Sequence, residues 1–120
     1  MNRDYRLYID DIIEAIEKIE KYVKGLTFDE FTRDTKTIDA VIRNFEIIGE
    51  ATKHIPDEVR QKYPDVPWRD MAGMRDKLAH EYFGIILEIV WKTIKKRLPE
   101  LKPLIKELLK KMSEEAGDEF

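Results

Sequence analysis

The sequence has no cysteine, and no apolar run in it approaches the ~18 residues that a bilayer crossing requires. The missing thiols exclude disulfide bonds and thiolate-based zinc sites, and they suit a reducing compartment. The missing apolar run excludes a transmembrane helix. Acidic Asp4 precedes any apolar stretch at the N-terminus, which predicts that this segment is not a secretory signal. We therefore expect a soluble, cytoplasmic protein.

The sequence also lacks a strong excess of positive or negative charge. The 22 basic and 25 acidic side chains leave a net charge of −3, so any affinity for nucleic acid must come from a local basic patch. The only histidines are His54 and His80, without a His-x-x-x-His pair, so we expect no metal and no cofactor. A length of 120 residues suits one domain, predicted at 1–112, followed by an acidic, disordered tail at 113–120.

Apolar residues recur every three or four positions along most of the chain, which is the pattern of helices that bury one face. The first stripe predicts a helix over about 5–23 that stops at Gly25. Thr27 and Glu30 have the spacing of a capping box, which predicts a new helical turn after that stop. This turn is expected to run on or to break near 34–35.

Further stripes predict three longer helices in the rest of the chain. They cover 38–55, which Pro56 ends, then 67–84, with proline at the first position, and then 87–112. The apolar period of the last helix survives two prolines, so a kink near Pro99 is expected rather than a reversal. The predicted fold is all-α, an up-and-down bundle of four to five helices.

One helical segment concentrates the chemistry-bearing side chains, since Arg75, Asp76, His80 and Tyr82 fall within eight residues. Asp76 and His80 are one turn apart, so the carboxylate can hold the imidazole tautomer and favour its charged form. Arg75 and His80 lie about 140° apart on a straight helix, and a second copy of the helix across a dimer could bring them together. By residue type alone, an Asp-x-x-x-His pair is more often a surface pair than a catalytic one.

The spacing Arg75-x(4)-His80-x-Tyr82 resembles the signature of HepT-like toxins in the HEPN ribonuclease superfamily. Further stretches resemble that family in the expected order, at 43–51, 67–75, 82–84 and 88–91, and the likeness covers roughly 5–110. One position departs from the pattern. Ile86 stands where relatives often carry an acidic residue that can cap the last helix.

This resemblance implies a metal-independent endoribonuclease, in which the ribose 2′-hydroxyl attacks the adjacent phosphate to leave a 2′,3′-cyclic phosphate. His80 would serve as base or acid, and Arg75 would hold phosphate oxygens. Asp76 would orient His80, and Tyr82 would contact the RNA. Each chain offers one motif histidine, so a homodimer with a shared cleft is implied. The implied partner is an MNT-type nucleotidyltransferase antitoxin that adenylylates the motif tyrosine, Tyr82.

Four lysines are candidate RNA-binding side chains: Lys77, Lys92, Lys95 and Lys96. The simpler interpretation of the basic stretch after residue 91 is a solvated face balanced by Glu88, Glu100 and Glu107. His54 is expected to be structural, as a cation near a helix C-terminus. Two other functions stay open. One is a non-catalytic module whose dimer cleft holds a nucleotide or a partner segment, and the other is a structural subunit that docks a nucleotidyltransferase.

Overall fold

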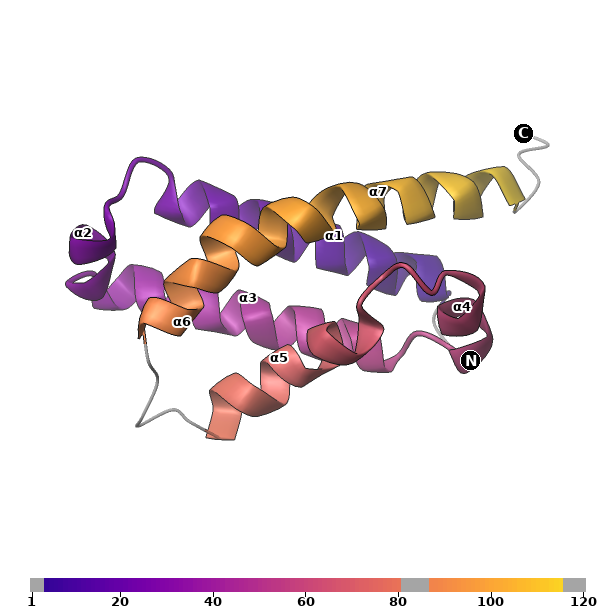
Figure 1. The fold of residues 1–120 in the computed structure, drawn as a ribbon, viewed down its shortest axis with the longest axis horizontal. Helices are drawn as coiled ribbons and strands as arrows, with labels where there is room; N and C mark the ends of the chain where they lie inside the picture. The colour runs from indigo at the N-terminus through magenta and orange to yellow at the C-terminus, as the bar shows by residue number, and fades with distance from the viewer. Residues whose placement is uncertain (1–3, 81–86, 116–120) are drawn as a thin grey trace.

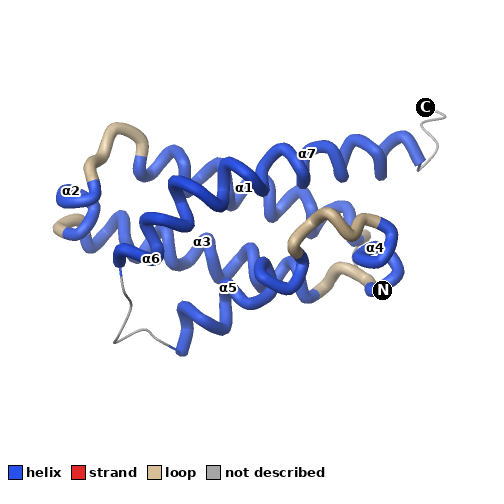
Figure 2. Tube along the Cα trace, viewed as in Figure 1, coloured by secondary structure: helices blue, strands red, loops and turns tan. Residues whose placement is uncertain are grey.

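The computed structural model describes residues 4–80 and 87–115, and for residues 75–80 it describes the backbone alone. Every regular element in this part of the chain is helical (Figure 2), which confirms the predicted all-α fold. The elements are α1 (Tyr5–Val23), α2 (Phe28–Thr32), α3 (Thr35–Lys53), α4 (Asp57–Lys62), α5 (Trp68–His80), α6 (Leu87–Lys92), the π-helical turn η2 (Thr93–Arg97) and α7 (Leu98–Glu115). None of the described helices combines the length and apolarity needed to cross a membrane.

Helix α3 lies in the middle of the bundle. It packs against α1 on one side and α5 on the other, while α7 runs along α1 (Figure 1). The predicted apolar stripes of α1 and α3 face inward, and Ile16, Phe45 and Ile48 have almost no exposed surface. Thr52 holds a place in the α3 stripe because its hydroxyl donates to the Ile48 carbonyl at 2.6 Å, so no polar group is left without a partner there.

The predicted helix boundaries at the first turn of the chain are confirmed. Gly25, with φ of +79°, follows the end of α1 and takes the left-handed conformation that glycine adopts at little cost. The Thr27 hydroxyl accepts from the Glu30 amide at 3.1 Å, and the Glu30 carboxylate accepts from the Thr27 amide at 2.9 Å. Asp34 caps α3 by accepting from the Thr37 amide at 3.0 Å, so the chain breaks between α2 and α3.

A side-chain cap from α4 that the sequence analysis did not foresee closes the other end of α3. Helix α3 ends at Lys53, two residues before the expected end at Ile55, and its last carbonyls then need donors from outside the helix. The Arg60 guanidinium in α4 donates to the carbonyl of Thr52 at 2.7 Å and to that of Ile55 at 3.1 Å. The short helix α4 is thereby fixed against the end of α3, and it delivers the chain to the start of α5.

The interruption expected near Pro99 is a π turn. The Leu98 amide donates to the Thr93 carbonyl, five residues back, where a regular helix would use the residue four back. Pro99 has no amide hydrogen, and its ring would press on the Lys95 carbonyl in a regular helix, so a wider turn relieves that contact. Helices α6 and α7 thus form one rod whose axis changes direction around η2 (Figure 1).

The extra residue of this π turn changes which side chains face the core. The three-four spacing of Leu87, Trp91 and Ile94 in the sequence predicts that Trp91 faces the core, one turn before Ile94. In the structure Val90 is 2% exposed and takes that position, and Trp91 is only half-buried. A π turn holds one residue more than a regular turn, so the residues that precede it are rotated relative to α7. Trp91 is therefore placed at the edge of the core.

Helix α7 extends past Met112, where the sequence placed the start of an acidic tail. Residues 113–115 are helical, and residues 116–120 lie outside the described part. The reason for the extension is a contact with α4. Glu115 accepts from the Lys62 ammonium at 2.7 Å and from the Tyr63 hydroxyl at 3.1 Å. These hydrogen bonds, led by that from Lys62, lower the pKa of the Glu115 carboxyl below its usual value.

The pKa of Glu115 predicts a pH-dependent contribution to folding. A carboxyl whose pKa is lowered by folding stabilises the native state above its unfolded pKa, and this effect is lost as the pH falls through its folded pKa. We expect Glu115→Gln to lower the melting temperature at neutral pH, and the difference from the parent to shrink as the pH falls below about 4 and to disappear below the folded pKa. The neighbouring exposed Glu114→Gln is the control and should show no such difference. A difference between parent and Glu115→Gln that persists in acid would contradict the assignment.

Candidate functional site

The helix that carries the motif, α5, is fixed at its beginning. The Trp68 indole donates to the Tyr63 carbonyl at 3.0 Å, and Met71, one turn later, is fully buried. The helix begins at Trp68, one residue after the expected start at Pro67, whose carbonyl accepts from the Met71 amide. A satisfied indole and a buried methionine place the first turn of α5 firmly on the core.

The motif residues lie on the last turns of this helix. Arg75, Asp76, Lys77 and His80 fall within α5, so the expected helical relation between them holds for the backbone. Asp76 and His80 are four residues apart and share a face of the helix. The side chains of these four residues, and the whole of Tyr82, lie outside the described residues, as do Ile86 and the expected helix end at Gly84. The roles assigned to them remain predictions.

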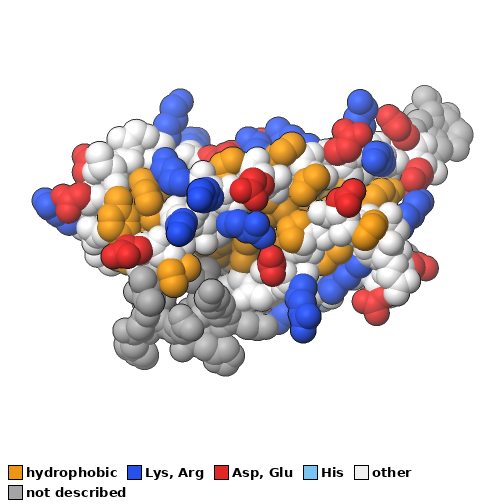
Figure 3. Space-filling model, viewed as in Figure 1, with side chains coloured by type: hydrophobic (Ala, Val, Ile, Leu, Met, Phe, Trp, Pro, Cys, Tyr) orange, Lys and Arg blue, Asp and Glu red, His pale blue; other side chains and the backbone are white. Residues whose placement is uncertain are grey.

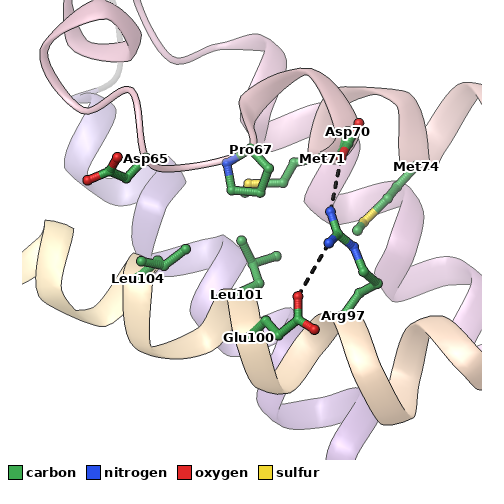
Figure 4. Close-up of a pocket in the computed structure, with 9 residues that line it drawn as sticks. All are labelled: Asp65, Pro67, Asp70, Met71, Met74, Arg97, Glu100, Leu101 and Leu104. Atoms are coloured by element: carbon green, nitrogen blue, oxygen red, sulfur yellow. Dashed lines mark hydrogen bonds and ion pairs between the residues drawn. The ribbon is translucent and has the colours of Figure 1, made fainter.

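A cleft of about 230 Å³ lies between the start of α5 and the π turn and α7 (Figure 4). Its apolar side includes Met71 and Leu101, which are almost fully buried. At its rim the Arg97 guanidinium lies between two carboxylates, 2.9 Å from Asp70 and 3.3 Å from Glu100. Because Arg97 pairs with both carboxylates, its positive charge is not free to bind a phosphate in the cleft. We interpret Arg97 as a tie between α5 and the last helix.

A second hollow, of about 400 Å³, opens on the α1–α3 face, where the 43–51 block contributes Arg43, Glu46 and Glu50. His54 lies at its end as the C-terminal cap of α3. Its ring stacks on that of Tyr8, with centroids 4.7 Å apart and planes 11° apart, and its Nε2 lies 3.7 Å from Glu50. This packing agrees with the structural role expected for His54.

Asn44, in the same block, is buried with 5% exposure. Its Nδ2 donates to the Ala40 carbonyl at 2.9 Å, and its Oδ1 has no hydrogen-bond partner in the described structure. The single hydrogen bond joins the side chain to the backbone of its own helix, and the described contacts give Asn44 no chemical role. Among the described residues, no group of three or more His, Asp and Glu side chains is placed to hold a metal ion.

The basic stretch after the motif contains both paired and unpaired cations. On the same rod, Arg97 pairs with Asp70 and Glu100, and Lys102 and Lys106 pair with glutamates of α1. Three exposed lysines in α6 and η2 make no ion pair with any described carboxylate: Lys92, Lys95 and Lys96. Glu88, Glu100 and Glu107 were expected to balance them, yet Glu100 is engaged by Arg97, and the other two form no ion pair within the described structure.

Comparison with known proteins gives a consistent result. The family described as "Ribonuclease HepT-like" matches residues 12–108. A protein of Thermococcus cleftensis named "Probable ribonuclease HepT" is 48% identical over 110 residues, which cover 92% of this chain and 100% of that protein. Proteins named "Putative RNase" from Caldanaerobacter subterraneus and Methanocaldococcus jannaschii are 47% and 45% identical. The first alignment covers 88% of this chain and 95% of the relative, and the second covers 90% and 89%. No solved structure matches the chain.

The exposure of Arg97 and Asp70 predicts a weak tie between α5 and the last helix. Their side chains are 48% and 65% exposed, so solvent screens the pair, and we expect a coupling energy of about 0.2–1 kcal/mol. A double-mutant cycle with Asp70→Asn and Arg97→Gln, followed by urea unfolding, measures it. The same cycle with Glu100→Gln is the comparison within one helix. A coupling of about 2 kcal/mol or more between Asp70 and Arg97 would show that the pair is a main support of α5.

Proposed function

The chain belongs to the HepT-like ribonuclease family, and from that premise we propose that it is a metal-independent endoribonuclease that acts as the toxin of a toxin–antitoxin pair. The observation that carries the proposal is the complete motif Arg75-x(4)-His80-x-Tyr82 within the matched residues 12–108. The position of Arg75, Asp76 and His80 on a single helix supports it. The names of the relatives support the choice of RNA as the substrate.

In the proposed reaction, the 2′-hydroxyl of a ribose attacks the adjacent phosphorus, and the bond to the 5′-oxygen of the next nucleotide breaks. The products are a 2′,3′-cyclic phosphate and a free 5′-hydroxyl. A base must accept the 2′-proton, and an acid must give a proton to the leaving 5′-oxygen. His80 can serve in either role because imidazole titrates near neutrality. Arg75 would hold two phosphate oxygens and stabilise the charge of the phosphorane.

We further propose that the active species is a homodimer. The reaction needs a base and an acid, and each chain has one histidine in its motif. A twofold axis beside α5 would bring two copies of the motif to one cleft and would supply both groups. It would also bring Arg75 of one chain near His80 of the other, which a single helix holds about 140° apart.

The unpaired lysines give the RNA a route to this site. Since Lys92, Lys95 and Lys96 make no ion pair in the described structure, they can meet phosphates without first breaking one. They follow the motif closely in the chain, because α6 begins at Leu87. Lys77 lies on α5 itself, between Arg75 and His80. The local charge thus offsets the negative charge of the whole chain, which would otherwise repel RNA.

The first test is cleavage of total cellular RNA by the purified protein in EDTA, beside His80→Ala. We expect cleavage by the parent and a loss of at least about a hundredfold in the variant, since general acid–base catalysis contributes about that much. Size-separated fractions should show activity only where the mass is that of two chains. Cleavage by neither protein would instead favour the non-catalytic module, whose dimer cleft holds a nucleotide or partner segment.

A second proposal concerns the partner, an MNT-type nucleotidyltransferase that transfers AMP to the Tyr82 hydroxyl. The added phosphate would place negative charge beside Arg75 and would block entry of RNA. After co-expression with such an antitoxin, mass spectrometry is expected to find one AMP per chain on the peptide that contains Tyr82. Tyr82→Phe should remain unmodified. A neutralised complex in which Tyr82 is unmodified would contradict this mode of control.

A further inference from the structure

Trp91 has an unusual position for a large aromatic side chain in this bundle. The π turn rotates it away from the core position that Val90 occupies, and its ring is half-buried. On the core side it contacts Phe31, whose ring centroid lies 5.1 Å away, and Phe28 lies 6.0 Å away. These rings of α2 support the indole from behind, so Trp91 is a fixed aromatic surface rather than a loose side chain.

The outer surroundings of Trp91 are basic. The ammonium of Lys95, an exposed residue, lies 4.8 Å from the centroid of the indole ring. Lys92 and Lys96 lie on the same stretch of helix and, like Lys95, have no carboxylate partner in the described structure. Figure 3 shows lysine and arginine side chains beside hydrophobic ones over this part of the rod. An aromatic ring bordered by unpaired cations is the combination with which proteins bind single-stranded nucleic acids.

We propose that Trp91, Lys92, Lys95 and Lys96 form a subsite for single-stranded RNA, in which one base stacks on the indole and the lysines bind the flanking phosphates. The subsite deepens the proposed ribonuclease function and rests on it. A paired base has no free face, so the subsite selects unpaired segments. Six residues separate His80 from Leu87, a span of at most about 25 Å, so the same RNA can reach both the motif and Trp91.

The contact between Lys95 and Trp91 does not prevent such stacking. A cation over an exposed ring is held weakly, and a base stacked on the same ring is held more strongly. When a base takes this position, the displaced ammonium meets the negative phosphate of the same nucleotide. Lys95 therefore exchanges its contact with the Trp91 ring for an ion pair with a phosphate, which is the stronger interaction. In the free protein, Lys95 lies over the indole ring.

The test is a titration of the full-length protein, in a His80→Ala background that cannot cleave, with a single strand of about ten uridines. Stacking of a base on Trp91 is expected to quench tryptophan fluorescence. The other tryptophan, Trp68, is 7% exposed with its indole nitrogen bonded, and it serves as an internal reference. Trp91→Phe should remove the quenching while keeping most of the affinity, and Trp91→Leu should weaken binding roughly tenfold.

The lysines are tested by salt dependence. Each of Lys92→Gln, Lys95→Gln and Lys96→Gln should reduce the slope of log affinity against log salt by about 0.7. Lys110→Gln is the matched control, since it removes the same charge from an exposed, unpaired position of α7 and should leave the slope unchanged. The lysine variants alter only exposed side chains and are expected to fold. Their salt dependence therefore tests the proposal even if Trp91→Leu fails to fold.

Two results would overturn the proposal. One is binding of the uridine strand without quenching and with the same affinity in Trp91→Leu and in the three lysine variants. The other is an equal loss of affinity for single-stranded and fully paired RNA in Trp91→Leu, which would show that no unpaired base stacks there. The titration measures binding by a protein that cannot cleave, so a failure of the subsite proposal is distinguishable from a failure of the proposed function. Binding without cleavage would support the subsite alone, and cleavage without quenching would support the ribonuclease alone.

Discussion

The position of α3 between α1 and α5 is the constraint on which the rest of the described structure depends. The inward side chains of α3 are almost wholly buried against both neighbours, and Arg60 closes its C-terminal end through the carbonyls of Thr52 and Ile55. Because α4 is held at that end, the chain enters α5 at a fixed point, with Trp68 bonded to the Tyr63 carbonyl. The motif residues of α5 inherit their position from this sequence of contacts rather than from any contact of their own that the structure describes.

Much of this architecture could be predicted because it depends on neighbours in the chain. The stripes of α1 and α3, the stop at Gly25 and the capping box of Thr27 all involve residues within four positions of each other. The contacts that the sequence did not reveal are polar pairs outside these short spacings, such as Arg60 to the end of α3, eight residues back, and Lys62 to Glu115, which is distant in the chain. Polar pairs of this kind are numerous in a chain with 39% charged residues, so no spacing rule selects the correct ones.

The candidate site, too, could be predicted from the sequence only in part. The spacing of Arg75, Asp76 and His80 was enough to place them on one helix, but their chemical roles rest on the family resemblance. For the lysines, counting nearby acidic residues suggested a balanced, solvated face. That count could not show that Arg97 engages Glu100, which leaves Lys92, Lys95 and Lys96 without a partner in the described structure. The position of Trp91 was also missed, since its spacing from Ile94 fits a regular helix, and the π turn has no signature in an apolar period.

The π turn makes one surface of the molecule depend on chain length as well as on residue type. A regular α-helix between α6 and α7 would need one residue fewer in the segment 93–97. A single-residue deletion there would replace the π turn by a regular turn and would keep Val90 against the core, since Val90 would then lie seven residues before Leu98. A regular α-helix through the segment at its present length would instead rotate α6 by about 100° and turn Trp91 toward the core, so the outer face of the last helix depends on the match between segment length and helix type. When HepT-like chains are compared, their length through this segment is as informative as the identity of the residues in it.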